Sequence, residues 1–93
     1  MDEYPTYPRV AFVEPRSGRR LLVTFSDGTR KVYDCTPLLT SEVFAPLNDE
    51  ALFRCVKADP DGYGVVWNDE IDLAESELWI NSQAIEREDE ACR

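Results

Sequence analysis

The stretch FSDGTRKVYD, residues 25–34, decides the fold, because it predicts a β-hairpin in the first half of the chain. The dipeptide Asp27-Gly28 separates two short runs, LLVTF at 21–25 and RKVYD at 30–34. Their alternating apolar residues are typical of strands that bury one face. Asp-Gly accepts the positive φ angles that both central positions of a two-residue turn require. We therefore expect Asp27 and Gly28 to form that turn.

A two-residue turn also predicts how the strands pair. It places Val23 opposite Val32 and Leu22 opposite Tyr33, so apolar side chains meet across the hairpin. A three-residue turn would instead place Val23 opposite Lys31, which is a poorer pair. The sequence therefore favours the first register.

Asp34 ends this hairpin, three residues before Pro37. In the expected register its side chain shares a face with Val23 and Val32. An aspartate at the end of a strand, just before x-x-Pro, is suited to accept backbone N–H groups in an Asx turn. The chain contains no histidine, so the carboxylate lacks a common acid–base partner. We interpret Asp27, Gly28, Asp34 and Pro37 as structural residues.

Periodicity along the rest of the chain predicts a small single domain of the α+β class, with antiparallel hairpins and two or three short helices. The domain is expected at 10–81, after an extended segment at 1–9 and before an acidic tail at 82–93, either a frayed helix or disordered. Asn48 is the expected N-cap of a short helix that continues to Phe53. Further strands are predicted at 10–14, 55–59, 64–67 and 71–73, turns at 15–18 and 60–62, and helical turns at 38–47 and 75–80.

The charge is unevenly distributed along the 93 residues. Residues 1–48 carry six acidic and six basic side chains, whereas residues 49–93 carry thirteen acidic and four basic ones, which accounts for the net charge of −9. An acidic surface repels nucleic acid and anionic lipid, and it attracts basic proteins. The alternative interpretation is that the negative charge only keeps the domain in solution.

The three cysteines, Cys35, Cys55 and Cys92, are widely spaced and include no C-x-x-C pair. They indicate neither a disulfide framework nor a zinc site, and free thiols fit a reducing cytosol. We expect Cys35 and Cys55 to be buried, as well as Phe12. No signal peptide or membrane-spanning run is apparent, so a cytoplasmic location is predicted.

Candidate catalytic and metal-binding residues are few. Without histidine there is no Ser–His, Cys–His or H-E-x-x-H arrangement, and no phosphate-binding glycine motif is present. Residues 59–70 resemble a calcium loop, but Tyr63 stands where an oxygen ligand belongs and the flanks are predicted strands. Trp67 is expected to pack in the core rather than stack on a base. We predict no enzyme activity, no cofactor and no metal.

The acidic second half supplies the candidate interaction surface for a basic protein. Its proposed members are Asp69, Glu70, Asp72, Glu75 and Glu77.

An ordered set of short patterns then points to a family. V-x-F at 10–12 is followed by L-x-V-x-F-x-D-G, Y-D-x-x-P-L-L, F-x-x-L-x-D, F-x-x-V and I-D-L-x-x-x-x-L-W, which ends at Trp79. This order resembles the bacterial domain of unknown function 2442. The resemblance implies a small α+β domain with an antiparallel sheet and short helices, and it implies no catalytic residue.

The resemblance also carries expectations about partners. Members of the family often lie beside small proteins of domain of unknown function 4160, in an arrangement like a toxin–antitoxin pair. Some relatives carry a C-terminal helix-turn-helix; we expect none here, because residues 82–93 read as an acidic tail, so direct nucleic-acid binding is not expected. The leading hypothesis is a non-enzymatic module that binds a small basic protein encoded nearby, as the antitoxin-like or regulatory member of a pair. The alternative is a domain that senses a small ligand, and a homodimer remains open.

Overall fold

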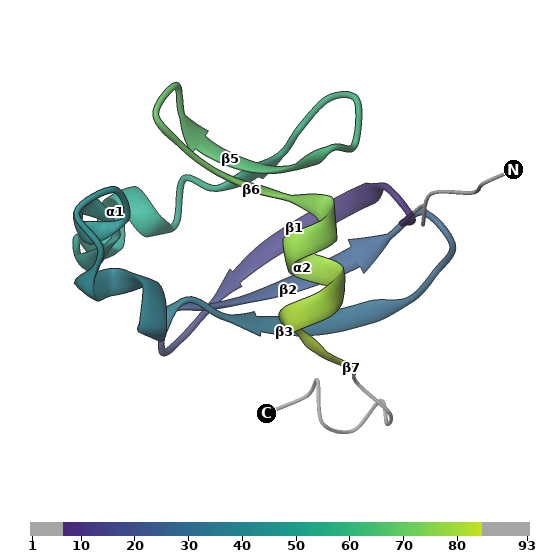
Figure 1. Ribbon diagram of the computed structural model, residues 1–93, viewed down its shortest axis with the longest axis horizontal. Coiled ribbons are helices and arrows are strands. Elements are labelled where there is room, and N and C mark those ends of the chain that lie inside the picture. The colour runs from purple at the N-terminus through teal and green to yellow at the C-terminus, as the bar shows by residue number, and fades with distance from the viewer. Residues whose placement is uncertain (1–6, 85–93) are drawn as a thin grey trace, which may run out of the picture.

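Two antiparallel sheets and a set of short helices form the fold (Figure 1). The computed structural model of the chain describes residues 7–84. The larger sheet has the strand order β1-β2-β3-β7 and the smaller one the order β4-β5-β6. The strands are β1 Val10–Arg16, β2 Arg20–Phe25, β3 Arg30–Asp34, β4 Lys57–Ala58, β5 Gly64–Asn68, β6 Ile71–Ala74 and β7 Gln83–Ala84. The helical elements are the 3-10 helices η1 Thr36–Thr40 and η2 Ala45–Asn48 and the α-helices α1 Glu50–Phe53 and α2 Glu75–Asn81. The α+β class expected from the sequence is confirmed.

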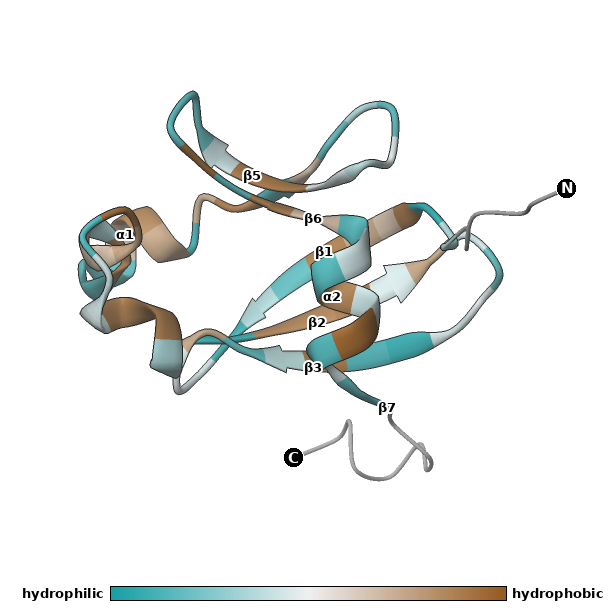
Figure 2. Cartoon of the chain, in the orientation of Figure 1, coloured by the Kyte–Doolittle hydropathy of each residue, from teal (hydrophilic) through white to brown (hydrophobic). Residues whose placement is uncertain are grey.

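Helix α2 lies against one face of the larger sheet (Figure 1). The ring of Phe25 meets the ring of Trp79 edge-on, with centroids 5.0 Å apart. Apolar residues concentrate along β2, β5 and β6, which enclose the core (Figure 2). The core consists of Val10, Leu21, Val23, Phe25, Tyr33, Cys35, Leu47, Phe53, Val56, Val65, Trp67, Ile71, Leu73 and Leu78.

The turn of the central hairpin corrects the predicted register. The connection has three residues, because the N–H of Phe25 donates to the carbonyl of Thr29, and Gly28 alone takes a positive φ, of 94°. A tight turn followed by a glycine in this region is the common three-residue hairpin. The side chain of Asp27 accepts the N–H of Thr29 at 2.9 Å, which fixes the turn. The observed pairs are Leu21 with Tyr33, Leu22 with Val32 and Val23 with Lys31.

Lys31 can lie opposite the buried Val23 because its long stem follows the core to helix α2. Its ammonium group lies 3.8 Å from the centre of the Trp79 ring and donates to the Trp79 carbonyl at 2.7 Å. On the same face, the hydroxyl of Tyr33 donates to a carboxylate oxygen of Glu77 at 2.8 Å. The pair that looked unfavourable in sequence therefore joins the hairpin to α2.

Strand β1 is the second correction. The pairing of β1 with β2 shifts between Val10 and Phe12, so Val10 enters the core while Phe12 turns outward and is 70% exposed. A bulge moves the following side chains to the opposite face, which alternation alone does not reveal. The turn after β1 lies at Ser17–Arg19 rather than at 15–18.

Smaller differences concern caps and ends. Asp49, not Asn48, caps α1, because its carboxylate accepts the N–H of Ala51 at 3.0 Å. Cys35 is buried as expected, but Cys55 is exposed. Gln83–Ala84, expected in the tail, pair with β3 instead. The remaining predictions for the N-terminal segment, the tail and Cys92 fall on 1–6 and 85–93, which lie outside the described residues.

Candidate protein-interaction surface

Asp34 is held by the backbone rather than aimed at a substrate. Its carboxylate accepts the N–H of Thr36 at 2.9 Å, which is the geometry of an Asx turn. Hydrogen bonds from Thr36, the backbone bond first, hold the pKa of Asp34 below its ordinary value, and the charge of Arg20 acts in the same direction. In the observed register Asp34 lies opposite Arg20, on the outer face of the sheet, and not with Val23. The turn leads directly into η1, whose first turn contains Pro37.

Three of the five candidate acids lie together on the β5–β6 hairpin. Asp69 and Glu70 form its turn, which is fixed because the side-chain oxygen of Asn68 accepts the N–H groups of Glu70 and Ile71 at 2.8 and 3.0 Å. Asp72 follows on the exposed face of β6, opposite Val66. These carboxylates point into solvent from a short, well-braced hairpin.

The other two acids lie on α2 and differ from each other. Glu75 begins the helix, and its N–H donates to the carbonyl of Tyr63 at 3.0 Å. Glu77 accepts the Tyr33 hydroxyl, and burial, followed by this hydrogen bond and the charge of Glu77, raises the pKa of Tyr33. Glu77 is therefore half-buried, and one of its carboxylate oxygens is held by a hydrogen bond within the fold. Within residues 7–84, no ion pair joins Asp69, Glu70, Asp72 or Glu75 to a lysine or arginine.

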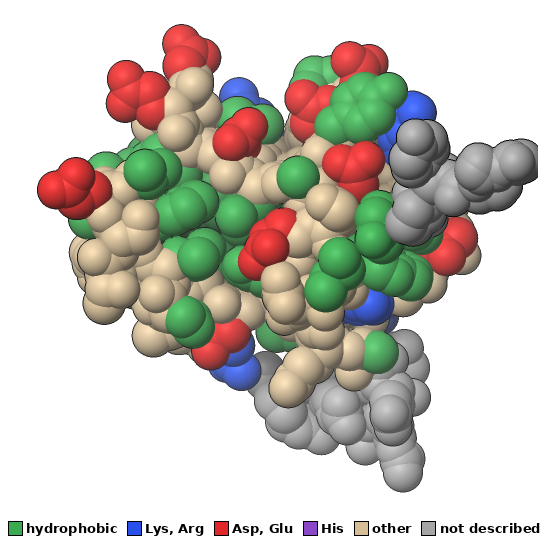
Figure 3. Space-filling view, in the orientation of Figure 1, with side chains coloured by type: hydrophobic (Ala, Val, Ile, Leu, Met, Phe, Trp, Pro, Cys, Tyr) green, Lys and Arg blue, Asp and Glu red, His purple; other side chains and the backbone are tan. Residues whose placement is uncertain are grey.

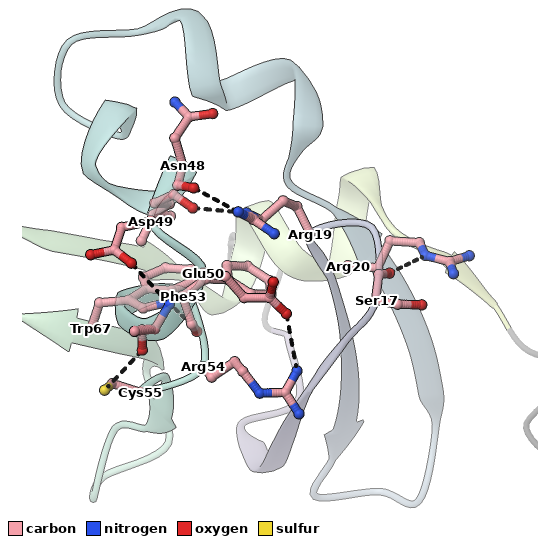
Figure 4. Close-up of polar contacts among 12 residues, drawn as sticks. Ser17, Arg19, Arg20, Asn48, Asp49, Glu50, Phe53, Arg54, Cys55 and Trp67 are labelled. Carbon is pink, nitrogen blue, oxygen red and sulfur yellow. Dashed lines mark hydrogen bonds and ion pairs between the residues drawn. The ribbon is translucent and has the colours of Figure 1, made fainter.

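Residues 36–54, here called the helical lobe, pack beside the β5–β6 hairpin, where Phe53 of the lobe meets Trp67 of β5 (Figure 4). Arg19 connects the lobe to the larger sheet: its guanidinium donates to the carbonyls of Leu47 and Asn48 at 2.9 and 2.6 Å. The same group lies 5.6 Å from the centre of the Phe53 ring. Trp67 connects the lobe to the smaller sheet, because its indole N–H donates to the Phe53 carbonyl at 3.0 Å.

Comparison of the sequence with protein-family models shows the family of the chain. The model of the family described as "Protein of unknown function (DUF2442)" matches residues 10–84. The chain belongs to this family. Neither a search of curated proteins nor a search of solved structures found a match to the chain.

The calcium-loop pattern of this DUF2442 chain is a backbone turn. The carboxylate of Asp59 accepts the N–H groups of Asp61 and Tyr63 at 2.8 and 3.4 Å, and the loop connects two strands. In the part of the chain that the structure describes, no cluster of three or more acidic, cysteine or histidine side chains could hold a metal ion. Over the same residues, none of the helices has the length and apolar character needed to span a membrane.

Sequence reasoning missed two features of the surface. Arg19 stands with Arg16 and Arg20 at a turn, where arginines are typically solvated, yet it donates to a carbonyl 28 residues away in sequence. The helical lobe also carries apolar side chains that are not fully covered. In the sequence, the signal for Arg19 is its place beside Gly18, where the chain reverses. The structure shows that Arg19 takes a positive φ there, of 59°.

Proposed function

We propose that this DUF2442 protein is a non-enzymatic interaction module that binds a small basic protein, as the antitoxin-like or regulatory member of a pair. One observation carries the proposal. Asp69, Glu70 and Asp72 project from one braced hairpin, and within residues 7–84 they are not neutralised by an ion pair.

Electrostatics explains why such a hairpin suits a basic partner. Unpaired carboxylates on a chain with a net charge of −9 create a field that accelerates the approach of a positively charged protein. The field is screened over about 8 Å at physiological ionic strength, so its effect falls as salt is added. The hairpin would therefore contribute mainly to the association rate.

The roles of other carboxylates support the non-enzymatic part of the proposal. Asp34 and Asp59 accept backbone N–H groups, and Glu77 accepts the Tyr33 hydroxyl. A general base needs a carboxylate that is free to take a proton from a bound substrate. These three acids instead stabilise turns and the docking of α2.

The test begins with affinity capture from the source organism at low and moderate salt, followed by binding kinetics with the basic protein recovered. The variant Asp69→Asn/Glu70→Gln should slow association, and the loss should shrink as salt rises. The control Glu14→Gln/Asp34→Asn changes the net charge equally but alters the outer face of the larger sheet, and the amide oxygen of the introduced asparagine can still accept the Thr36 N–H. Failure to enrich any basic protein, or equal effects of both variants, would count against the proposal.

A further inference from the structure

The helical lobe presents an apolar surface beside the acidic hairpin. Val43 is 55% exposed in the connection between η1 and η2. Apolar side chains gather over the side where the lobe approaches β6 and α2, and acidic side chains stand along its border (Figure 3). Exposed apolar patches of this kind mark binding sites more often than the rest of a surface does. The half-buried members of the lobe surface are Leu38, Leu39, Phe44 and Leu52.

This surface is preformed. Pro37 and Pro46 stand in the first turns of η1 and η2, where they restrict the backbone. Arg19 holds the end of η2, and Trp67 holds the end of α1, through hydrogen bonds to backbone carbonyls. A partner that binds here does not have to order the lobe, which lowers the entropic cost of binding.

The acidic turn is connected to the lobe through Trp67. Trp67 donates to the Phe53 carbonyl of the lobe and precedes Asn68, Asp69 and Glu70 by one to three positions. Glu42 is exposed and adjacent to Val43 in the lobe itself. An apolar centre with carboxylates at its edge complements a segment that is apolar on one side and positively charged around it.

We propose that the lobe surface and the Asp69–Glu70 turn together bind an amphipathic basic helix of the partner. This inference rests on the proposed function, and it names the part of the partner that makes contact. The lobe, residues 36–54, contains helical turns and no strand, so it offers no sheet edge to an extended peptide. A segment that lies on the lobe gains no strand partner from it, and a helix suits this because it satisfies its own backbone hydrogen bonds.

Charge separates this site from Phe12, the most exposed large apolar side chain among the described residues. Phe12 is more exposed than Val43, but it lies on the outer face of the larger sheet. That face also carries three arginines. Arg16 lies opposite Arg20, and Arg30 lies opposite Thr24, which also pairs with Phe12. Glu14 and Asp34 lie on the same face and nearly balance these charges, so a basic segment is attracted less there than at the acidic turn, and we assign it to the lobe.

The test uses a designed helical peptide of leucine and lysine with its leucines on one face, and a scrambled peptide of the same composition. Titration calorimetry and amide chemical shifts would report affinity and location. The helical peptide should bind more tightly than the scrambled one and shift amides of the lobe and of the β5–β6 turn. Val43→Ser should weaken binding about tenfold, since the valine would otherwise be buried on binding. Phe12→Ser, the control on the opposite face, should leave affinity unchanged.

Three results would overturn the inference. Equal binding of both peptides would show that charge alone acts, and then the proposed function would stand if Asp69→Asn/Glu70→Gln still weakened both. Shifts centred on Phe12 would place the contact on the other face. No measurable binding of either peptide would remove the lobe site, and the capture experiment would then decide the proposed function separately.

Discussion

Arg19 should be the side chain outside the core whose removal costs the most stability. In Arg19→Ala the two carbonyls at the end of η2 lose a charged donor, and Phe53 loses the guanidinium above its ring. A hydrogen bond from a charged group contributes about 1.5–3 kcal/mol, and an exposed cation–π contact about 0.5–1 kcal/mol. The bond to Asn48 is exposed and the bond to Leu47 is half-buried, so water replaces part of both. We expect a loss of about 2–3 kcal/mol in the free energy of unfolding.

A second substitution separates the side chain from the backbone. Arg19 has a φ of 59°, and a non-glycine residue in this region is strained by about 1–2 kcal/mol. Arg19→Gly loses the same contacts but relieves that strain, so it should be more stable than Arg19→Ala by about 1 kcal/mol. Arg20→Ala is the matched control, because among residues 7–84 its side chain donates to the nearby Ser17 carbonyl and its charge acts on Asp34, and it should change stability by less than about 0.5 kcal/mol.

Urea denaturation followed by tryptophan fluorescence would measure all three variants, since Trp67 lies against the same Phe53. An unchanged midpoint in Arg19→Ala would refute the reasoning that Arg19 holds the lobe. A glycine variant less stable than the alanine variant would show that the positive φ carries no strain. The first result would also weaken the view that the lobe surface is preformed.

Three further predictions concern single residues. Gly28→Val should lower the free energy of unfolding by about 1–3 kcal/mol, because Gly28 has a φ of 94°, which strains a β-branched residue. A Cβ at this position would meet no atom within 4 Å, so the loss would come from backbone strain and not from a clash. An unchanged denaturant midpoint would show that this strain is absent. Asp34→Ala should cost about 0.5–2 kcal/mol at neutral pH. Because the native pKa of Asp34 is lowered, its contribution is present above the unfolded pKa of about 3.9 and is lost as the pH falls through the lower native value, so the stability gap to Asp34→Ala should close below about pH 4 in acid denaturation curves. Burial raises the pKa of Cys35 to about 12, so iodoacetamide at neutral pH should label the exposed Cys55 and spare Cys35, as read by peptide mass spectrometry; labelling of Cys35 in the folded protein would contradict its burial.

Local elements were accessible to sequence reasoning because their signals are local. Asp-Gly predicted the position of the central turn, alternating residues predicted the strand at 30–34, and the β-prone run GVVW predicted the strand at 64–67, close to the observed β3 and β5. The acids of the β5–β6 turn were also recognisable as exposed, since Asn68, Asp69 and Glu70 form an unbroken polar run. Their position beside an apolar lobe was not, because no short pattern relates Asp69 to Val43.

The register of the central hairpin, the outward turn of Phe12 and the contacts of Arg19 depended on the tertiary structure. A hairpin can choose between a two- and a three-residue turn at small cost, so distant contacts decide which register forms. Lys31 lies opposite Val23 because Trp79, 48 residues away, accepts its ammonium group and covers its stem. The sequence determined which segments become strands and helices, since that depends on neighbours along the chain. Which faces meet, and therefore which surface is left for a partner, was decided by packing between segments that no local pattern connects.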